Sequence, residues 1–337
     1  MAAHIFRAAV IGCGRIGGDS GPPSLGSSRL LSHAAGYRGC PRTKLVSGSD
    51  PDPETRRRFC ERWDIERSYE DHREMLARER VELVSVCSPV SSHTAILSDV
   101  LDSRNVTGVL LEKPIGMDSA DAEAAVQMVD KSAAKVAVNY VRRYVPAYIE
   151  VAEWVSAGYL GEIQKVRGFY TKGVLNNGSH MLDLLRFFWG DPEGLEVLGG
   201  LPEPGQDPTL SFRACFEKGV EAFVFGVNQR AFNIFEIDVL GSRGRVVFSD
   251  LGHLRETYSR QDTKKAHGFR QLSPRPEVAP TSLGDGTRFA IENLIESIEA
   301  DRAPRCTVHD ARAALSLSLE LIRSAAPERA PDPGASA

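Results

Sequence analysis

Three groups of residues in this chain have the types and spacing to carry chemistry. They are a glycine-rich turn near the N-terminus, the tripeptide Glu112-Lys113-Pro114, and His180 at the start of an apolar segment. A lysine transfers protons when its surroundings lower its pKa, and a histidine can orient an oxygen or share a proton. A surface lysine and a structural histidine are the plainer alternatives, so the interpretation depends on the elements that position these residues.

The glycine-rich turn consists of Gly12, Gly14 and Gly17, and it follows an apolar strand predicted for residues 5–11. This is the G-x-G-x-x-G spacing of a dinucleotide-binding turn. The first glycine permits the tight turn, the second lets the backbone approach a pyrophosphate, and the third allows close packing of helix on strand. Amide groups at the next helix N-terminus would hold the pyrophosphate. A turn without a ligand is the alternative.

Asp50 directly follows a second predicted strand, residues 44–49. An acidic side chain there accepts hydrogen bonds from the adenosine ribose and repels a 2′-phosphate, so it predicts NAD rather than NADP. Asp50 lies further from the glycines than the usual distance of about 20 residues, which an insertion within residues 18–43 explains. A turn or capping role is the alternative, and the arginines at 56–58 could accept a phosphate.

The chain before residue 140 alternates predicted strands and helices. Strands are expected over residues 5–11, 44–49, 82–87, 106–111 and 136–140. Helices are expected over residues 53–63, 93–103 and 118–132. This alternation predicts an α/β fold with a doubly wound parallel sheet, which binds ligands at the carboxyl ends of its strands. We therefore interpret residues 1–140 as an NAD(P)-binding Rossmann domain.

From about residue 165 the pattern changes to alternating apolar and polar residues. Strands are expected over residues 165–171, 210–216, 220–227, 234–240 and 245–248, followed by helices over 289–300 and 309–324. This pattern is typical of a large, open, mainly antiparallel sheet with one covered face. We interpret residues 141–326 as a second domain of α+β type, and the Pro-, Ala- and Gly-rich residues 327–337 as a disordered tail.

The composition excludes several classes of protein. The 337 residues carry a net charge of −4, with 42% hydrophobic and 26% charged residues. We find no basic stripe for nucleic acid and no apolar run long enough for a membrane span. The six cysteines are scattered without a CxxC pair, so we expect no metal site and a reducing compartment. The predicted first strand begins within a few residues of Met1, which leaves no room for a signal peptide and points to the cytoplasm.

In their order and spacing, these features resemble the glucose–fructose oxidoreductase, inositol 2-dehydrogenase and rhizopine-catabolism (Gfo/Idh/MocA) superfamily over nearly the full length. The motifs that carry the resemblance are the glycine turn, Ser88-Pro89 with His93, Glu112-Lys113-Pro114, Arg142-Arg143-Tyr144-Val145-Pro146, residues 158–163, residues 178–183 and the helix that ends near Ser324. The resemblance implies a Rossmann domain followed by a domain whose open sheet binds substrate and mediates homodimer or homotetramer contacts.

The resemblance also implies roles for individual residues. The lysine of Glu-Lys-Pro and the histidine of the second domain flank the substrate carbon beside the nicotinamide in similar enzymes, and these are Lys113 and His180 here. The implied cofactor contacts are Gly12, Cys13, Gly14, Arg15, Ile16, Asp50, Ser88, Pro89, His93, Glu112 and Lys113. The candidate substrate contacts are Arg143, Tyr148, Lys172 and Asn176.

One position departs from the family pattern. Many members carry an aspartate four residues before the histidine, whereas this chain carries Asn176. Asparagine cannot ionise and so cannot stabilise an imidazolium. We therefore expect His180 to act as a neutral hydrogen-bonding group and Lys113 to carry the proton. Some nucleotide-sugar 3-dehydrogenases are similar at this position, which shifts the expectation towards sugars carried on nucleotides.

Together these features predict an NAD-dependent oxidoreductase that acts on CH-OH groups. Hydride would pass between nicotinamide and a ring secondary alcohol or ketone of a sugar, nucleotide sugar or cyclitol. Two alternatives remain: a non-catalytic regulator that senses dinucleotides on the same fold, and a reductase of a non-sugar carbonyl or imine. The presence of both Lys113 and His180 argues against the regulator.

Overall fold

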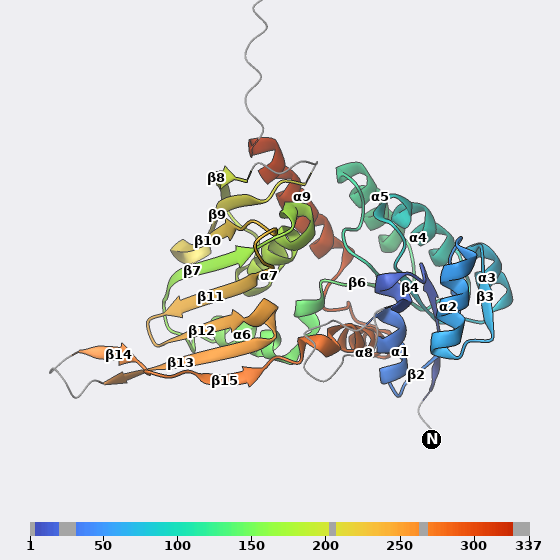
Figure 1. Ribbon diagram of the computed structural model, residues 1–337, viewed down its shortest axis with the longest axis horizontal. Coiled ribbons are helices and arrows are strands. Elements are labelled where there is room, and N and C mark those ends of the chain that lie inside the picture. Colours follow the sequence, from blue (N-terminus) through green and yellow to red (C-terminus); the bar gives the residue numbers. More distant parts are fainter. Residues whose placement is uncertain (1–3, 20–31, 202–206, 263–268, 326–337) are drawn as a thin grey trace, which may run out of the picture.

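The computed structural model describes residues 4–19, 32–201, 207–262 and 269–325. Two sheets lie side by side with helices packed against them (Figure 1). The tail predicted to be disordered and the middle of the insertion lie outside the described residues. Within the described part of the chain, no helix is both long enough and apolar enough to span a bilayer.

The first sheet has six parallel strands in the order β3-β2-β1-β4-β5-β6. Its strands are β1 (Phe6–Ile11), β2 (Thr43–Ser49), β3 (Arg67–Tyr69), β4 (Leu83–Val86), β5 (Gly108–Leu111) and β6 (Lys135–Val138). Every residue of β4 and β5 is buried, as expected for strands covered on both faces. The strand order reverses between β1 and β4, which is where doubly wound sheets bind their ligands. The predicted Rossmann fold is therefore confirmed.

Helices α1 (His33–Gly39), α2 (Pro53–Trp63), α3 (His72–Arg78), α4 (His93–Leu101) and α5 (Ser119–Asp130) connect these strands. Local chemistry explains where α2 begins, because the Asp52 carboxylate accepts a hydrogen bond from the Thr55 backbone N–H and Pro53 occupies the first turn. The capping residue of α2 is thus Asp52. Asp50 therefore does not cap α2, which was one of the alternatives for this residue.

The insertion changes the connection after the glycine turn. The turn leads into η1 (Arg15–Asp19), a five-residue π-helix, and α1 begins only at His33 with Ser32 as its N-cap. The Ser32 hydroxyl accepts a hydrogen bond from the Ala35 backbone N–H at 3.2 Å. The start of α1 therefore has its own N-capping signal, and His33, its first residue, is buried.

The second sheet has nine strands in the order β14-β13-β12-β11-β7-β10-β9-β8, with β15 paired to β13. They are β7 (Ile163–Tyr170), β8 (Gly194–Gly200), β9 (Leu210–Phe216), β10 (Val220–Gly226), β11 (Phe235–Gly241), β12 (Gly244–Ser249), β13 (Leu254–Asp262), β14 (Arg270–Leu272) and β15 (Glu277–Pro280). Only the β7–β10 pair is parallel among the pairings described for this sheet, so the sheet is mainly antiparallel, as predicted. Burial alternates along β9 and β11, which means that one face is covered. Helices α6 (Pro146–Ser156) and α7 (Ser179–Trp189) contribute to the core on that face.

The last two helices connect the two halves of the molecule. Helix α8 (Gly286–Glu299) places Ile291 and Leu294 in the core of the first sheet. Helix α9 (Val308–Ala325) contributes Leu315 to the first core and Leu321 to the second, and it runs between the two halves in Figure 1. The sequence range 141–326 therefore supplies a helix that packs with residues of the range 1–140.

Candidate active site

A cleft opens at the carboxyl ends of β1, β2 and β4. Its empty volume is about 1330 Å³, and Gly12, Gly14, Asp50, Ser88 and Pro89 all line it. Five of the predicted cofactor contacts therefore meet in one place. Residues 70–72, which follow β3, also line this cleft; sequence reasoning missed them because β3 has only three residues.

The glycine turn fits a dinucleotide for steric reasons. A Cβ on Gly12, whose φ is +86°, would lie 2.7 Å from the Ser88 backbone nitrogen, and a Cβ on Gly17 would lie 1.9 Å from the Gly12 carbonyl oxygen. Neither position can carry a side chain without moving the backbone. Nothing lies within 4 Å of the Cβ position of Gly14, so the backbone there is open to a pyrophosphate.

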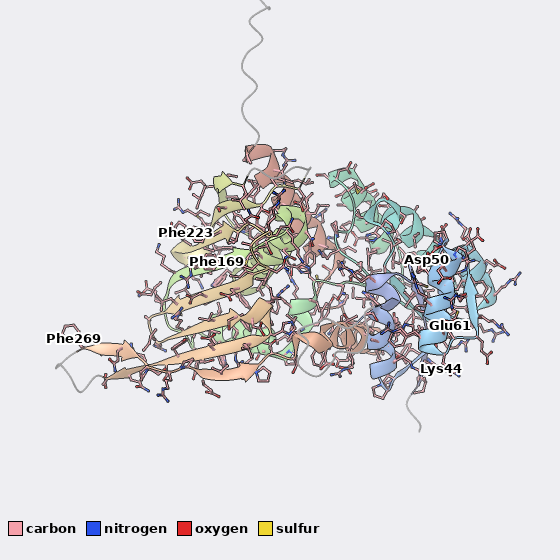
Figure 2. The ribbon with its side chains drawn as sticks, viewed as in Figure 1. Lys44, Asp50, Glu61, Phe169, Phe223 and Phe269 are labelled. Atoms are coloured by element: carbon pink, nitrogen blue, oxygen red, sulfur yellow. The ribbon has the colours of Figure 1, made fainter. Side chains whose placement is uncertain are left out.

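Asp50 joins the glycine turn to the end of β2 (Figure 2). Its carboxylate accepts hydrogen bonds from the backbone N–H groups of Cys13 at 2.9 Å and Asp52 at 3.0 Å. Each carboxylate oxygen has a second lone pair, so acceptor capacity for ribose hydroxyls remains. The position and the free lone pairs suit the ribose-binding role expected of Asp50.

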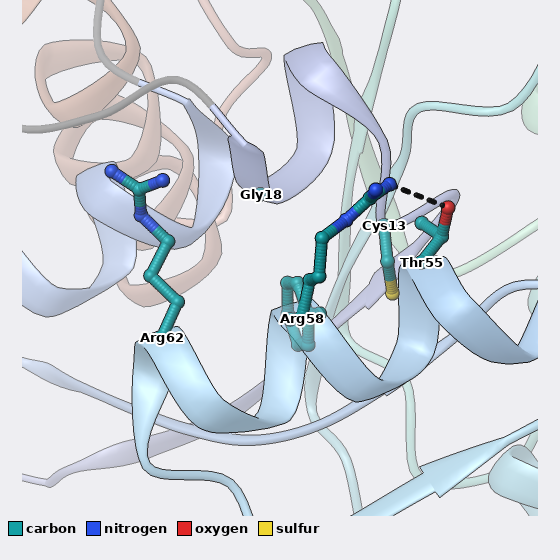
Figure 3. A pocket seen from close by; sticks show the side chains of 6 residues that line it. Cys13, Gly18, Thr55, Arg58 and Arg62 are labelled. Carbon is teal, nitrogen blue, oxygen red and sulfur yellow. Dashed lines mark hydrogen bonds between the residues drawn. The ribbon is translucent and has the colours of Figure 1, made fainter.

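The three arginines after Asp50 bind groups within the protein. Arg56 donates to the carbonyl oxygen of Asp50 at 2.7 Å, and Arg57 pairs with two glutamates of its own helix. Arg58 donates to the Thr55 hydroxyl at 3.2 Å, beside a small pocket near Gly18 (Figure 3). These contacts account for the three guanidinium groups without a phosphate.

The remaining predicted cofactor residues divide by burial. Arg15 and Ile16 are exposed on η1, and Cys13 is buried, which raises the pKa of its thiol. His93 is also buried, and its ring nitrogens lie 2.9 Å from the carbonyl oxygens of Ser88 and Pro114. The side chain of His93 therefore connects two loops of the site instead of facing the cleft, in contrast to the expected cofactor contact.

Glu112 belongs to a buried polar network that the sequence did not reveal. Its carboxylate accepts a hydrogen bond from Asn139 at 2.6 Å and lies 2.9 Å from the His33 ring, whose other nitrogen contacts Ser85 at 2.8 Å. Burial opposes ionisation, but His33, Asn139 and the neighbouring Lys113 hold the pKa of Glu112 below its usual range. Glu112 is thus a partly buried anion directly beside Lys113.

Lys113 lies at the end of β5 and faces the second half of the chain. Its Nζ donates a hydrogen bond to Asn176 Oδ1 at 3.0 Å. Asn176 belongs to η4 (Gly173–Gly178), a short π-helix directly before α7. Burial, together with the charge of Arg142, lowers the pKa of Lys113 below its usual range although Glu112 and Asp207 oppose the shift. Two separately predicted site residues, Lys113 and Asn176, are therefore in direct contact, whereas the sequence argument had related Asn176 to His180.

A second cavity surrounds this contact, with an empty volume of about 620 Å³. Lys113, Asn176 and Asp207 form its polar lining. Its apolar lining comes from Val90, Met117, Leu175 and Leu315. The cavity thus combines groups that can handle a proton with apolar walls, as small-molecule sites do.

His180 lies in the first turn of α7. Its ring meets the ring of Tyr140 edge-on, with 5.3 Å between the centroids. Burial, followed by the charges of Lys113 and Arg142, holds the pKa of His180 well below its usual range. These causes favour the neutral imidazole. The hydrogen bond described for the Asn176 side chain goes to Lys113, so this side chain acts on the lysine directly.

Two expected substrate contacts lie instead in the protein interior. Arg143 is buried, pairs with Asp183 at 2.9 Å and reaches Asp310 at 3.1 Å. Tyr148 is fully buried, stacks on Phe248 with 3.9 Å between centroids, and donates to a backbone carbonyl. Both side chains satisfy their polar groups within the protein, so a structural role replaces the expected substrate role.

The other expected contact, Lys172, has an exposed side chain and a left-handed backbone with φ of +71° just before η4. Sequence reasoning missed Arg142, which lies over the Phe235 ring at 3.5 Å and whose charge acts on both Lys113 and His180. Two adjacent arginines carry no local signal that tells which one faces the site. Only the packing of the second sheet distinguishes them.

Known proteins resemble this chain in sequence and in fold. Residues 6–140 match the sequence model of the Gfo/Idh/MocA oxidoreductase family with an NAD-binding Rossmann fold. The match covers the part of the chain that forms the first sheet and the nucleotide cleft.

Two relatives and one solved structure illustrate the likeness. An inositol 2-dehydrogenase of Rubrobacter xylanophilus is 32% identical over 164 residues, which are 44% of this chain and 45% of the relative, so the match spans about half of that protein. An inositol 2-dehydrogenase of Rhizobium meliloti is 23% identical over 90% of this chain and 96% of the relative. An oxidoreductase from Agrobacterium radiobacter, solved with NAD+, L-tartaric acid and magnesium, shares the fold with a TM-score of 0.76 at 17% identity, over 96% of this chain and 97% of that one.

Proposed function

We propose that this protein is an NAD-dependent dehydrogenase that transfers hydride between nicotinamide and a ring secondary alcohol or ketone. The substrate class is a cyclitol, sugar or nucleotide sugar. The observation that carries the proposal is the partly buried Lys113 amine, held 3.0 Å from Asn176 in a cavity beside the nucleotide cleft. The inositol dehydrogenases among the relatives support the cyclitol end of this range.

Lys113, Asn176 and His180 have different roles in the proton transfer. NAD, held by the glycine turn and Asp50, supplies the hydride acceptor or donor when it is bound. The Lys113 amine takes the proton from the substrate hydroxyl during oxidation and returns it during reduction, because its lowered pKa favours the free amine. Asn176 orients that amine through its Oδ1. A neutral His180 donates a hydrogen bond to the reacting oxygen.

The cavity around Lys113 suits a ring substrate. Its polar groups lie together, and they can bind the hydroxyls at one edge of a ring. The apolar side chains of Val90, Met117, Leu175 and Leu315 can cover the less polar ring face. This arrangement favours a polyhydroxylated ring over an extended apolar substrate.

We infer further that the protein forms a homodimer or homotetramer through the open face of the second sheet. On this face Phe225 is 36% exposed and contacts Phe169, with 5.6 Å between the ring centroids. Phe169 and Phe223 both lie on this sheet in Figure 2. Lys165 lies over the Phe223 ring, and Arg167 pairs with Asp238. Exposed aromatic residues bordered by charges are typical of protein interfaces.

The free cysteines favour a cytoplasmic location.

The test is a panel of cyclitols, free sugars and nucleotide sugars, assayed spectrophotometrically for NAD reduction with wild type and Lys113→Met. NAD binding is measured separately by fluorescence titration. Turnover of a ring secondary alcohol by wild type, lost in Lys113→Met while NAD binding persists, supports the proposal. NAD binding without turnover of any member of the panel would replace the dehydrogenase with a dinucleotide-sensing regulator.

A further inference from the structure

We propose that Asp207 is a positioning residue for Lys113, and that it supplies from a distant loop the carboxylate that Asn176 lacks. Asp207 lies just before β9, about 30 residues beyond η4, and it lines the same cavity as Lys113 and Asn176. The catalytic consequence of this inference rests on the proposed function, whereas the coupling between the two charged groups does not.

The contacts of Asp207 fasten the segment that carries Asn176. Its Oδ1 accepts a hydrogen bond from the Leu175 backbone N–H at 2.7 Å, and its Oδ2 accepts one from the Asn176 backbone N–H at 3.2 Å. The carboxylate packs so tightly against Gly173 that a Cβ there would lie 2.1 Å from Oδ2. The residue at 173 must therefore be glycine for the carboxylate to reach these amides.

The neighbours of Asp207 strengthen the same attachment. Pro208 accepts a hydrogen bond from the Val174 N–H, and the Thr209 hydroxyl accepts one from the Gly173 N–H, both at 3.0 Å. Residues 207–209 thus bind four consecutive backbone N–H groups of η4, from Gly173 to Asn176. The Asn176 side chain then reaches Lys113, so the position of Asp207 determines where the lysine amine finds its partner.

The charge of Asp207 acts on the same amine. Around Lys113 lie Glu112 on its own strand end, Arg142 from η3 (Val141–Tyr144), His180 from α7, and Asp207. Burial and Arg142 lower the pKa of Lys113, whereas Glu112 and Asp207 raise it. Burial in turn raises the pKa of Asp207, and Lys113 is among the groups that oppose this shift. The two groups therefore stabilise each other's charged forms.

The competing explanation is that Asp207 only fastens η4 and has no electrostatic effect on Lys113. Removing the charge of Asp207 distinguishes the two explanations. Without that charge the pKa of Lys113 falls if the carboxylate acts on the amine. A purely structural role of Asp207 does not require this fall. In the direction of alcohol oxidation, which needs the free amine, the acid limb of the pH–kcat profile then moves to lower pH. The maximal rate falls because the amine is a weaker base.

The experiment measures the pKa of the Lys113 amine directly, by competitive acylation over a pH series followed by peptide mass spectrometry. Wild type, Asp207→Asn and the swap Asn176→Asp/Asp207→Asn are compared, with Asp262→Asn as the matched control because the Asp262 side chain is 96% exposed. We expect the pKa of Lys113 to fall by about one unit in Asp207→Asn and to recover in the swap. An unchanged pKa in Asp207→Asn would overturn the proposal.

A reciprocal measurement covers the case in which Asp207→Asn does not fold. Lys113→Met removes the cation, and its loss is expected to raise the pKa of Asp207, followed by carbon-13 NMR of the carboxyl group. An Asp207 pKa that does not respond to Lys113→Met contradicts the coupling. Neither measurement uses a substrate. If no substrate turns over but the two pKa values are coupled, the proposed function fails and this inference stands. If a substrate turns over but the two pKa values are not coupled, only this inference fails.

Discussion

Replacement of Arg143 tests whether this residue supports the fold or binds substrate. In Arg143→Met, the Asp183 carboxylate, whose side chain is only 3% exposed, loses its partner. Leaving a buried charge without its partner costs about 3–5 kcal/mol. The second partner, Asp310, is 25% exposed and adds less. For a cooperative unit of about 150–250 residues, such as the half of the chain that contains Arg143, the loss corresponds to a fall in Tm of about 6–20 °C.

The cost has a pH dependence with a definite sign. Burial raises the pKa of Asp183 even in the presence of Arg143, and the loss of the guanidinium raises it further. A carboxyl group whose folded pKa lies above its unfolded pKa destabilises the fold at pH values above the folded pKa. As the pH falls through that folded pKa, Asp183 takes up a proton and the penalty disappears. The destabilisation is therefore larger at pH 7.5 than at pH 5.

The assay is thermal and urea unfolding of wild type and Arg143→Met at both pH values. Arg78→Met, which breaks an exposed pair within one helix, serves as the control and should cost about 0–0.5 kcal/mol. Asp183→Asn in the Arg143→Met background removes the unpaired charge and should recover part of the loss. A Tm close to that of wild type, together with a large rise in KM, would restore the substrate role of Arg143 and refute this reasoning.

Three further predictions concern the cofactor and the proton. Lys113→Met should lower kcat about 100-fold or more with little change in NAD affinity; near-normal turnover in steady-state assays would remove Lys113 from the mechanism. Asp50→Ala should weaken NAD binding about 10- to 100-fold by titration; wild type that binds NADP as tightly as NAD would contradict the ribose assignment. Asn176→Asp should raise the pKa of Lys113 and shift the acid limb of the oxidation profile to higher pH by about one unit; an unmoved profile would show that the 3.0 Å contact does not operate.

The sequence by itself determined much of the local structure. Helix α2 begins at Pro53 and ends at Trp63, as its charged pattern and proline predicted, because capping bonds form between residues a few positions apart. The buried strands of the first sheet were visible as apolar runs. Among the elements that were missed, β3 and β14 have only three residues each, which carry too weak a pattern. The longer helix α6 and strand β13 were missed as well.

The cofactor cleft could be predicted because topology places it. Gly12, Asp50 and Ser88 lie far apart in the sequence, but each directly follows a strand of one parallel sheet. The carboxyl ends of such strands share one edge, so knowledge of the fold class was enough to bring these residues together. The cleft lies at that edge and is lined by these residues.

Only the tertiary structure decided which side chains surround Lys113. Arg142 and Asp207 come from a pair of adjacent arginines and from a loop before β9, and no local pattern distinguishes them. Arg143 and not Arg142 pairs with Asp183 and Asp310, which lie 40 and 167 residues away in the sequence. Burial and charge at a site are sums over neighbours that the chain brings together only when it folds, and they have no counterpart in residue spacing.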